Sequence, residues 1–169
     1  MSSKKIINKV ALSSLVTLDL DEYIPKEEVF VFDLKDFLFK GIVLKERDFR
    51  SKLKEFNFSI YKNKIVALGC STSAIVPMWA YMLVATYLNS YCKNIYFGDK
   101  ERVLELLFLK NIDNINIEDF KNKKVIVKGC GNFKFTESIY VAVSKKLHRS
   151  VNSLMFGEAC SSVPVYKRK

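Results

Sequence analysis

Three of the four cysteines lie just beyond the predicted end of a β-strand, each shortly after a glycine. They are Cys70, Cys130 and Cys160. A thiolate is both a strong nucleophile and a ligand for soft metal ions. In an α/β protein the carboxyl ends of parallel strands share one edge of the sheet, and ligands bind at that edge. The spacing therefore predicts that these three thiols lie together at one sheet edge.

Zinc or iron is the cofactor predicted for such a cluster. Three thiolates need a fourth ligand for tetrahedral coordination. Glu158, two residues before Cys160, is the first choice, with Asp33 or water as alternatives. The chain has no C-x-x-C pair, so the fold has to bring the ligands together from three distant loops. The predicted metal ligands are Cys70, Cys130, Cys160 and Glu158.

Three other interpretations of the cysteines remain open at this point. In the first, Cys70 or Cys160 carries sulfur or an oxidising equivalent, and a neighbouring thiol resolves it. In the second, the cysteines only pack, and the protein is a non-catalytic interaction module whose basic surface binds an acidic partner. In the third, a cysteine is the nucleophile of an enzyme acting on a small anionic substrate, which Lys45 or Arg50 binds. No catalytic residue is assigned.

The predicted helix ends distinguish the cysteines from one another. A helix is predicted over residues 74–91, and a thiol just before a helix N-terminus is favoured as the thiolate, so Cys70 is the best candidate. Cys92 follows the other end of that helix and is predicted at the opposite sheet edge. The only histidine, His148, ends another predicted helix, where a cation complements the helix dipole. Catalysis by a Cys–His or Ser–His pair is therefore not predicted.

An alternation of strands and helices from residue 64 onwards predicts the sheet that positions these residues. Strands are predicted over residues 65–68, 94–97, 124–128 and 153–156, with helices over 74–91, 99–109 and 136–148 between them. Strands as apolar as residues 65–68 (IVAL) are typical of parallel sheets that helices cover on both faces. Right-handed crossovers then give a three-layer arrangement.

The N-terminal part of the chain adds strands over residues 15–18 and 29–34 and an amphipathic surface helix over 46–56. No internal repeat is visible as a sequence motif, and no Pro- or Gly-rich linker marks a domain boundary. We therefore predict a single α/β domain over residues 1–169. It is a three-layer fold with a mostly parallel sheet, which the N-terminal strands extend.

Charge and composition narrow the functional classes. The 28 Lys and Arg exceed the 18 Asp and Glu, giving a net charge of +10, but the basic residues are scattered. Nucleic acid is therefore not a predicted partner. Residues 65–92 carry no charge, yet the polar GCSTS segment at 69–73 divides them, so no membrane span is predicted. Reduced thiols without an export signal predict a cytoplasmic protein.

Four sequence blocks carry a family resemblance: residues 31–36 (VFDLKD), 45–50 (KERDFR), 79–85 (WAYMLVA) and 155–166 (MFGEACSSVPVY). They resemble a bacterial family of unknown function, numbered 2480 among such domains, and the likeness runs nearly end to end. The resemblance implies that Cys70, Cys130 and Cys160 occupy the family's cysteine positions, and that Cys92 does not. It implies no activity. It does imply an accessory role in iron–sulfur cluster assembly, with the assembly proteins as partners.

Overall fold

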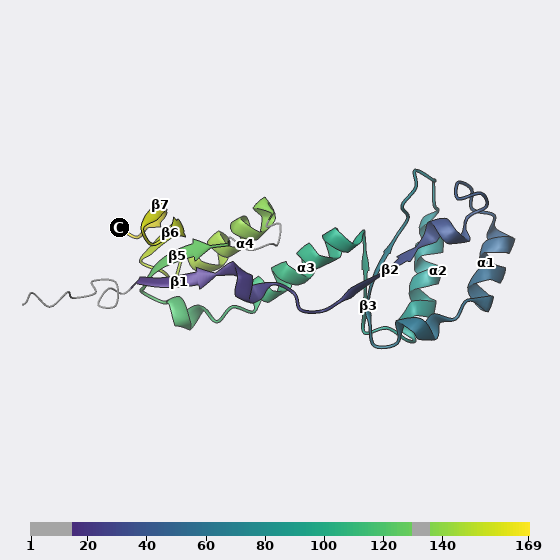
Figure 1. Cartoon of the computed structure of the whole chain (residues 1–169), viewed down its shortest axis with the longest axis horizontal. Helices are drawn as coiled ribbons and strands as arrows, with labels where there is room; N and C mark the ends of the chain where they lie inside the picture. Colours follow the sequence, from purple (N-terminus) through teal and green to yellow (C-terminus); the bar gives the residue numbers. More distant parts are fainter. Residues whose placement is uncertain (1–14, 130–135) are drawn as a thin grey trace, which may run out of the picture. The chain divides into compact units, whose positions relative to one another are not determined.

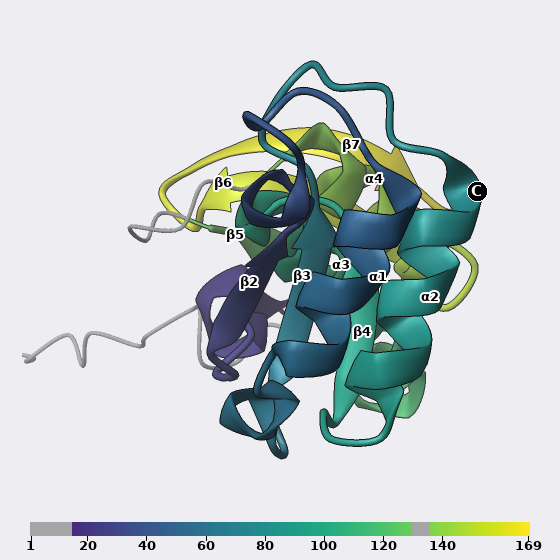
Figure 2. The same cartoon turned by 90° about the vertical axis from the view of Figure 1, so that its right-hand side faces the viewer.

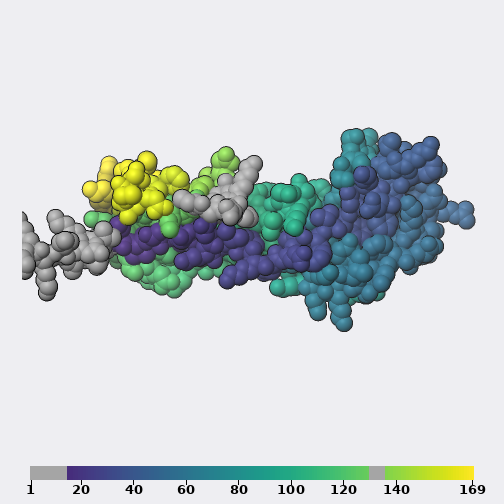
Figure 3. Space-filling model, in the orientation of Figure 1, coloured from purple at the N-terminus to yellow at the C-terminus, as the bar shows by residue number. Residues whose placement is uncertain are grey.

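The computed structural model describes residues 15–129 and 136–169. The chain divides into two compact units, each with its own sheet (Figure 1). Unit 1 consists of Met1–Pro25 and Phe108–Lys169, and unit 2 of Lys26–Leu107. Figure 3 shows their surfaces: the yellow C-terminal residues belong to unit 1 and the blue residues to unit 2. The single domain over residues 1–169 stays a prediction.

Unit 2 contains a three-stranded parallel sheet. Its strands are β2 (Val29–Asp33), β3 (Ile65–Gly69) and β4 (Asn94–Phe97), in the order β2-β3-β4. The central strand, β3, is buried from Ile65 to Leu68, as its unbroken apolar sequence predicted. All three strands end at the same sheet edge, because β2 and β4 both run parallel to β3.

Helices cover both faces of this sheet. Helices α1 (Glu46–Glu55) and α2 (Met78–Asn89) lie side by side over one face (Figure 2). On the other face, Val103 and Leu107 of α3 (Lys100–Asp113) pack against Ile65 and Ala67. Two short 3-10 helices, η2 (Leu34–Phe37) and η3 (Phe58–Tyr61), complete the unit. Unit 2 therefore has the three layers that the sequence predicted.

Unit 1 contains a four-stranded sheet with the order β1-β5-β6-β7. Its strands are β1 (Leu15–Asp19), β5 (Lys124–Lys128), β6 (Ser153–Glu158) and β7 (Ser161–Lys167). The first three are parallel, and β7 runs antiparallel to β6. The core joins this sheet to α4 (Glu137–Leu147), to the second half of α3, and to the 3-10 helices η1 (Leu20–Tyr23) and η4 (Ile117–Phe120).

The structure confirms the α/β class and the mostly parallel strands, but it has two sheets where the sequence predicted one. Periodicity shows that a strand is buried and gives no information on which distant strand it pairs with. Here Leu15 of β1 pairs with Lys124 of β5, whereas Val29 of β2 pairs with Ile65 of β3. Strand β7 was missed, because a proline inside a run of residues, here Pro164, argues against a strand.

Four consecutive elements of the two units repeat in the same order, a repeat that no sequence motif showed. Elements η3, β3, α2 and β4 of unit 2 correspond in order to η4, β5, α4 and β6 of unit 1. The first residues of the two sets are Phe58, Ile65, Met78 and Asn94, and Ile117, Lys124, Glu137 and Ser153, so each pair is 59 residues apart. The sheet orders, β2-β3-β4 and β1-β5-β6, also agree.

Backbone details support this correspondence. Asn63 and Asn122 both have left-handed backbones, with φ of 59° and 57°. The Asn63 amide donates to the Tyr91 carbonyl at 3.0 Å, and the Asn122 amide donates to the Ser150 carbonyl at 2.8 Å. The sequence hides the duplication, because few of these paired residues are identical outside the Lys-Asn-Lys turns at 62–64 and 121–123. Strand β7 has no described counterpart in unit 2.

The uncharged stretch that raised the question of a membrane span divides between β3 and α2. Helix α2 begins at Met78 rather than at residue 74, because Pro77 disfavours a helical backbone at Val76 and is itself well suited to a helix start. Among the described residues, no helix has both the length and the apolar character needed to cross a bilayer.

Candidate functional site

A thiol and a carboxylate come from neighbouring strands at the carboxyl edge of the unit 2 sheet. Asp33 is the last residue of β2, and Cys70 directly follows β3. The two strands are in register at this end, where Asp33 lies opposite Gly69. A side chain at Gly69 would place its Cβ 3.0 Å from the Gly98 carbonyl oxygen, so glycine lets the β3 and β4 exits approach closely. This edge is the usual ligand-binding edge of parallel sheets.

The Asp33 carboxylate is held by backbone amides from the segments that follow both strands. Its Oδ1 accepts hydrogen bonds from the Lys35 amide and the Ser71 amide, each at 3.0 Å. Burial raises the pKa of Asp33, but hydrogen bonds from Ser71 and Lys35 outweigh burial, so the pKa of Asp33 lies below its usual value. The carboxylate is therefore favoured in its charged form and tied to the loop that begins at Cys70.

The Cys70 thiol is free, and the residue is half-buried. Its Sγ lies 3.4 Å from Thr72 Oγ1, which donates to the Gly41 carbonyl at 3.1 Å. Burial raises the pKa of the Tyr81 phenol, and electrostatic interaction with Cys70 and Asp33 raises it further. We call Asp33, Cys70, Thr72 and Tyr81 the Cys70 site.

The other predicted ligands belong to unit 1. Cys160 is exposed and lies in the turn between β6 and β7, and Glu158 is the exposed last residue of β6. Cys130 lies outside the described residues. The expected shared edge is wrong for Cys70, because β3 belongs to a different sheet from β5 and β6. In the part of the chain that the structure describes, no group of three His, Cys, Asp or Glu side chains is placed to hold a metal ion.

One further expectation about the site needs correction, and a second stays open. Helix α2 begins eight residues after Cys70, so the helix dipole does not act directly on its thiol. Of the two anion binders considered for an enzyme, Lys45 Nζ lies 3.4 Å from the Phe39 ring centre and Arg50 pairs with Glu46 at 2.9 Å, and anion binding by either stays a prediction.

The cysteine and the histidine that were excluded from the site have structural roles. Cys92 donates from Sγ to the Leu88 carbonyl at 3.0 Å, and burial raises the pKa of its thiol. It precedes β4, at the opposite edge of the parallel sheet, as predicted. His148 is the C-cap residue of α4, in agreement with its predicted capping role.

Unit 1 has a second polar edge that the sequence analysis missed. Asp19 ends β1 as Asp33 ends β2, and each carboxylate caps the following 3-10 helix. Asp19 Oδ2 pairs with Lys128 Nζ at 2.9 Å, and this hydrogen bond, against a smaller effect of burial, lowers the pKa of Asp19. The pair lines a pocket of about 300 Å³ with Glu22 and Glu158. The similar sequences at residues 18–23 (LDLDEY) and 32–37 (FDLKDF) are the signal from which Asp19 could have been matched to Asp33.

The fold and the site define an α/β protein made of two similar parallel-sheet units, one of which carries a thiol beside a carboxylate at its ligand-binding edge. The chain belongs to the family described as a protein of unknown function (DUF2480), whose model matches residues 4–168. This match confirms the resemblance of the sequence blocks. Comparisons with curated proteins and with solved structures found no match.

Proposed function

We propose that the protein is a thiol-dependent metal carrier that binds zinc or ferrous iron at the Cys70 site as cargo and passes it to another protein. One observation carries this proposal: the amide of Ser71, the residue after Cys70, donates to the Asp33 carboxylate and so ties that carboxylate to the Cys70 loop. A thiolate and a carboxylate are both established ligands of these ions. The fixed charge of Asp33 favours a cation over an anionic substrate.

The small number of ligands favours transfer over permanent storage. Structural zinc sites are closed by four protein ligands, whereas a site with fewer protein ligands keeps positions open for exchange. The Cys70 site offers Cys70 and Asp33, and the described residues contain no larger metal-binding group. Cys130, Cys160 and Glu158 remain proposed ligands in unit 1. Iron–sulfur cluster assembly proteins are the proposed recipients.

Metal content of the protein purified without oxygen tests this proposal. After equilibration with Zn²⁺ or Fe²⁺ and desalting, we expect about one ion per chain to depend on Cys70. Cys70→Ser and Asp33→Asn should each reduce the bound metal at least fivefold, because each removes one ligand. Cys92→Ser is the matched control, since its thiol bonds to the Leu88 carbonyl in the same unit.

Single cysteine variants in unit 1 test whether the bound ion depends on unit 2 alone. Cys130→Ser and Cys160→Ser should leave the Cys70-dependent ion in place, because Cys70 and Asp33 lie within unit 2. Circular dichroism confirms that each variant is folded. A folded wild-type protein that binds neither ion, or that binds metal equally well after Cys70→Ser, would refute a Cys70 carrier site.

A further inference from the structure

The internal duplication exposes a difference between the two sheets at one edge. In unit 1, β6 pairs on its outer side with the antiparallel strand β7. Its counterpart in unit 2, β4, is the last strand of its sheet, and no described strand pairs with its outer side. An edge strand presents unpaired amide and carbonyl groups that can pair with another chain.

The hydrogen-bond pattern identifies which groups of β4 face outward. The Gly98 amide donates to the Leu68 carbonyl of β3 at 3.0 Å. Because backbone groups alternate along a strand, Ile95 and Phe97 direct their amides and carbonyls away from β3. Their counterparts in β6, Leu154 and Phe156, lie opposite Tyr166 and Val163 of β7. The same two backbone positions are therefore paired in unit 1 and open in unit 2.

Exposed apolar side chains lie on β4 and on the helix that contacts it, α2. Phe97 is 70% exposed, and Met78 and Met82 on the neighbouring helix α2 are 76% and 69% exposed. The Tyr81 ring packs edge-on against the Phe97 ring at 5.4 Å. Exposed apolar side chains on an edge strand and on its neighbouring helix are typical of an interaction surface.

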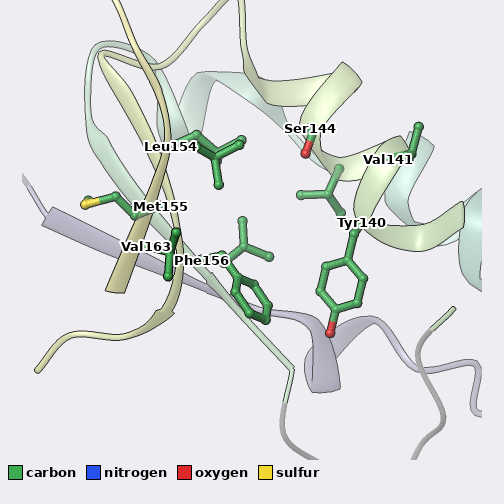
Figure 4. A pocket seen from close by; sticks show the side chains of 10 residues that line it. Tyr140, Val141, Ser144, Leu154, Met155, Phe156 and Val163 are labelled. Carbon is green, nitrogen blue, oxygen red and sulfur yellow. The ribbon is translucent and has the colours of Figure 1, made fainter. Parts of the chain in front are cut away.

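Unit 1 shows what occupies the equivalent corner. There the Tyr140 and Phe156 rings make the same edge-on contact at 5.5 Å (Figure 4). Val163 and Val165 of β7 face this pair across an apolar pocket of about 540 Å³. The occupant of the corner is therefore an antiparallel strand that carries apolar side chains.

We propose that a second copy of the chain supplies this strand in unit 2, so that β4 pairs with β4 of the second copy in a symmetric dimer. A two-fold axis makes such a pair antiparallel, like β6 and β7. With the axis at Tyr96, Ile95 of one copy lies opposite Phe97 of the other, and their outward backbone groups exchange two hydrogen bonds. The two three-stranded sheets then form one six-stranded sheet.

The sequence around β4 suits this register. Ile95 and Phe97 bring apolar side chains from both copies together on the α2 side of the sheet. In the same register, Lys93 of one copy lies opposite Asp99 of the other, so the ends of the pair have complementary charge. Strand β4 contains no proline, whereas Pro164 interrupts the amide row of β7. The β4 edge is therefore the better edge for self-pairing.

Sedimentation of the full chain over a range of concentrations tests the dimer. We expect the wild-type protein to dimerise and Phe97→Lys to raise the dissociation constant at least tenfold, because it places a charge against Ile95 of the second copy. Val31→Lys is the matched control: Val31 is 48% exposed and lies on β2, the opposite edge strand of the same sheet. It should leave the dissociation constant unchanged.

Cross-linking tests the register independently and does not require Phe97→Lys to fold. In the proposed dimer the Tyr96 residues of the two copies lie opposite each other across the axis and form a non-hydrogen-bonded pair. The Cα atoms of such a pair lie about 4.5 Å apart, which is within reach of a disulfide. Mild oxidation should give a covalent dimer with Tyr96→Cys, and no more than the wild-type amount with Val31→Cys. A folded monomer at all concentrations, a dimer indifferent to Phe97→Lys, or equal cross-linking by the two cysteine variants would overturn the proposal.

Discussion

Two aspartates, Asp19 and Asp33, end corresponding strands and have different partners. Both accept a hydrogen bond from the amide two residues later, which starts a 3-10 helix. Asp19 then pairs with a lysine, whereas Asp33 binds the Ser71 amide beside Cys70. The same backbone role thus leaves one carboxylate paired with a cation and the other tied to the loop that begins at Cys70.

The hydrogen bonds of Asp33 predict a pH dependence of stability. Its folded pKa lies below the unfolded value of about 3.9, so its contribution to stability is present above that pH and is lost as the pH falls through the folded pKa. Asp33→Asn should therefore lower the free energy of unfolding most at neutral pH, and the difference from wild type should shrink below pH 4. Urea unfolding at several pH values measures this difference. A deficit that stays constant with pH would contradict it.

At the scale of elements, helices α2 and α4 bury matching positions under matching sheets. Ala80, Val84 and Leu88 of α2 are buried, as are Ile139, Val143 and Leu147, the residues 59 positions later in α4. The spacing of four residues places each set on one helix face. Each helix therefore contributes to the core of its own unit.

Core substitutions should have similar effects in the two helices. Leu88 and Leu147 are both fully buried, so Leu88→Ala and Leu147→Ala should each cost about 2–5 kcal/mol of unfolding free energy, because each leaves a cavity. Thr86→Ala and Lys145→Ala are exposed controls on the same helices and should cost less than about 0.5 kcal/mol. Denaturant unfolding provides these values. A cost near zero for either leucine would argue against its place in the core.

At the scale of the whole molecule, unit 2 is one continuous segment, whereas unit 1 is assembled from two. The duplicated plan begins with β1 and η1, is interrupted by unit 2, and resumes in α3. The buried residues of unit 2 form clusters drawn from its own segment. A contiguous segment with its own core has what it needs to fold independently.

Residues 26–107 should therefore fold when produced alone. We expect circular dichroism to show helix and strand and thermal unfolding to be cooperative, because the core needs no residue of unit 1. Residues 108–169 alone are the matched comparison and should fold less well, because they lack β1, which pairs with β5. A featureless, non-cooperative spectrum for residues 26–107 would refute this expectation.

The sequence by itself determined most of the elements. Alternating polarity and helical spacing are local properties, so β1, β4 and β5 were predicted to within a residue of their observed ends. The position of Cys70 after a buried strand, and the opposite position of Cys92, followed from the same pattern. The roles of Asp33 and Asp19 did not, because an aspartate at a strand end is commonly only a turn residue.

Tertiary structure decided how these elements combine. Pairing of β1 with β5, and of β2 with β3, divides the strands into two sheets, and long-range pairing leaves no local trace in the sequence. It also decided that the Ser71 amide ties the Asp33 carboxylate to the Cys70 loop, since this bond joins residues far apart in the chain. The duplication became visible only in three dimensions, because packing conserves burial and backbone geometry while many different apolar side chains satisfy both.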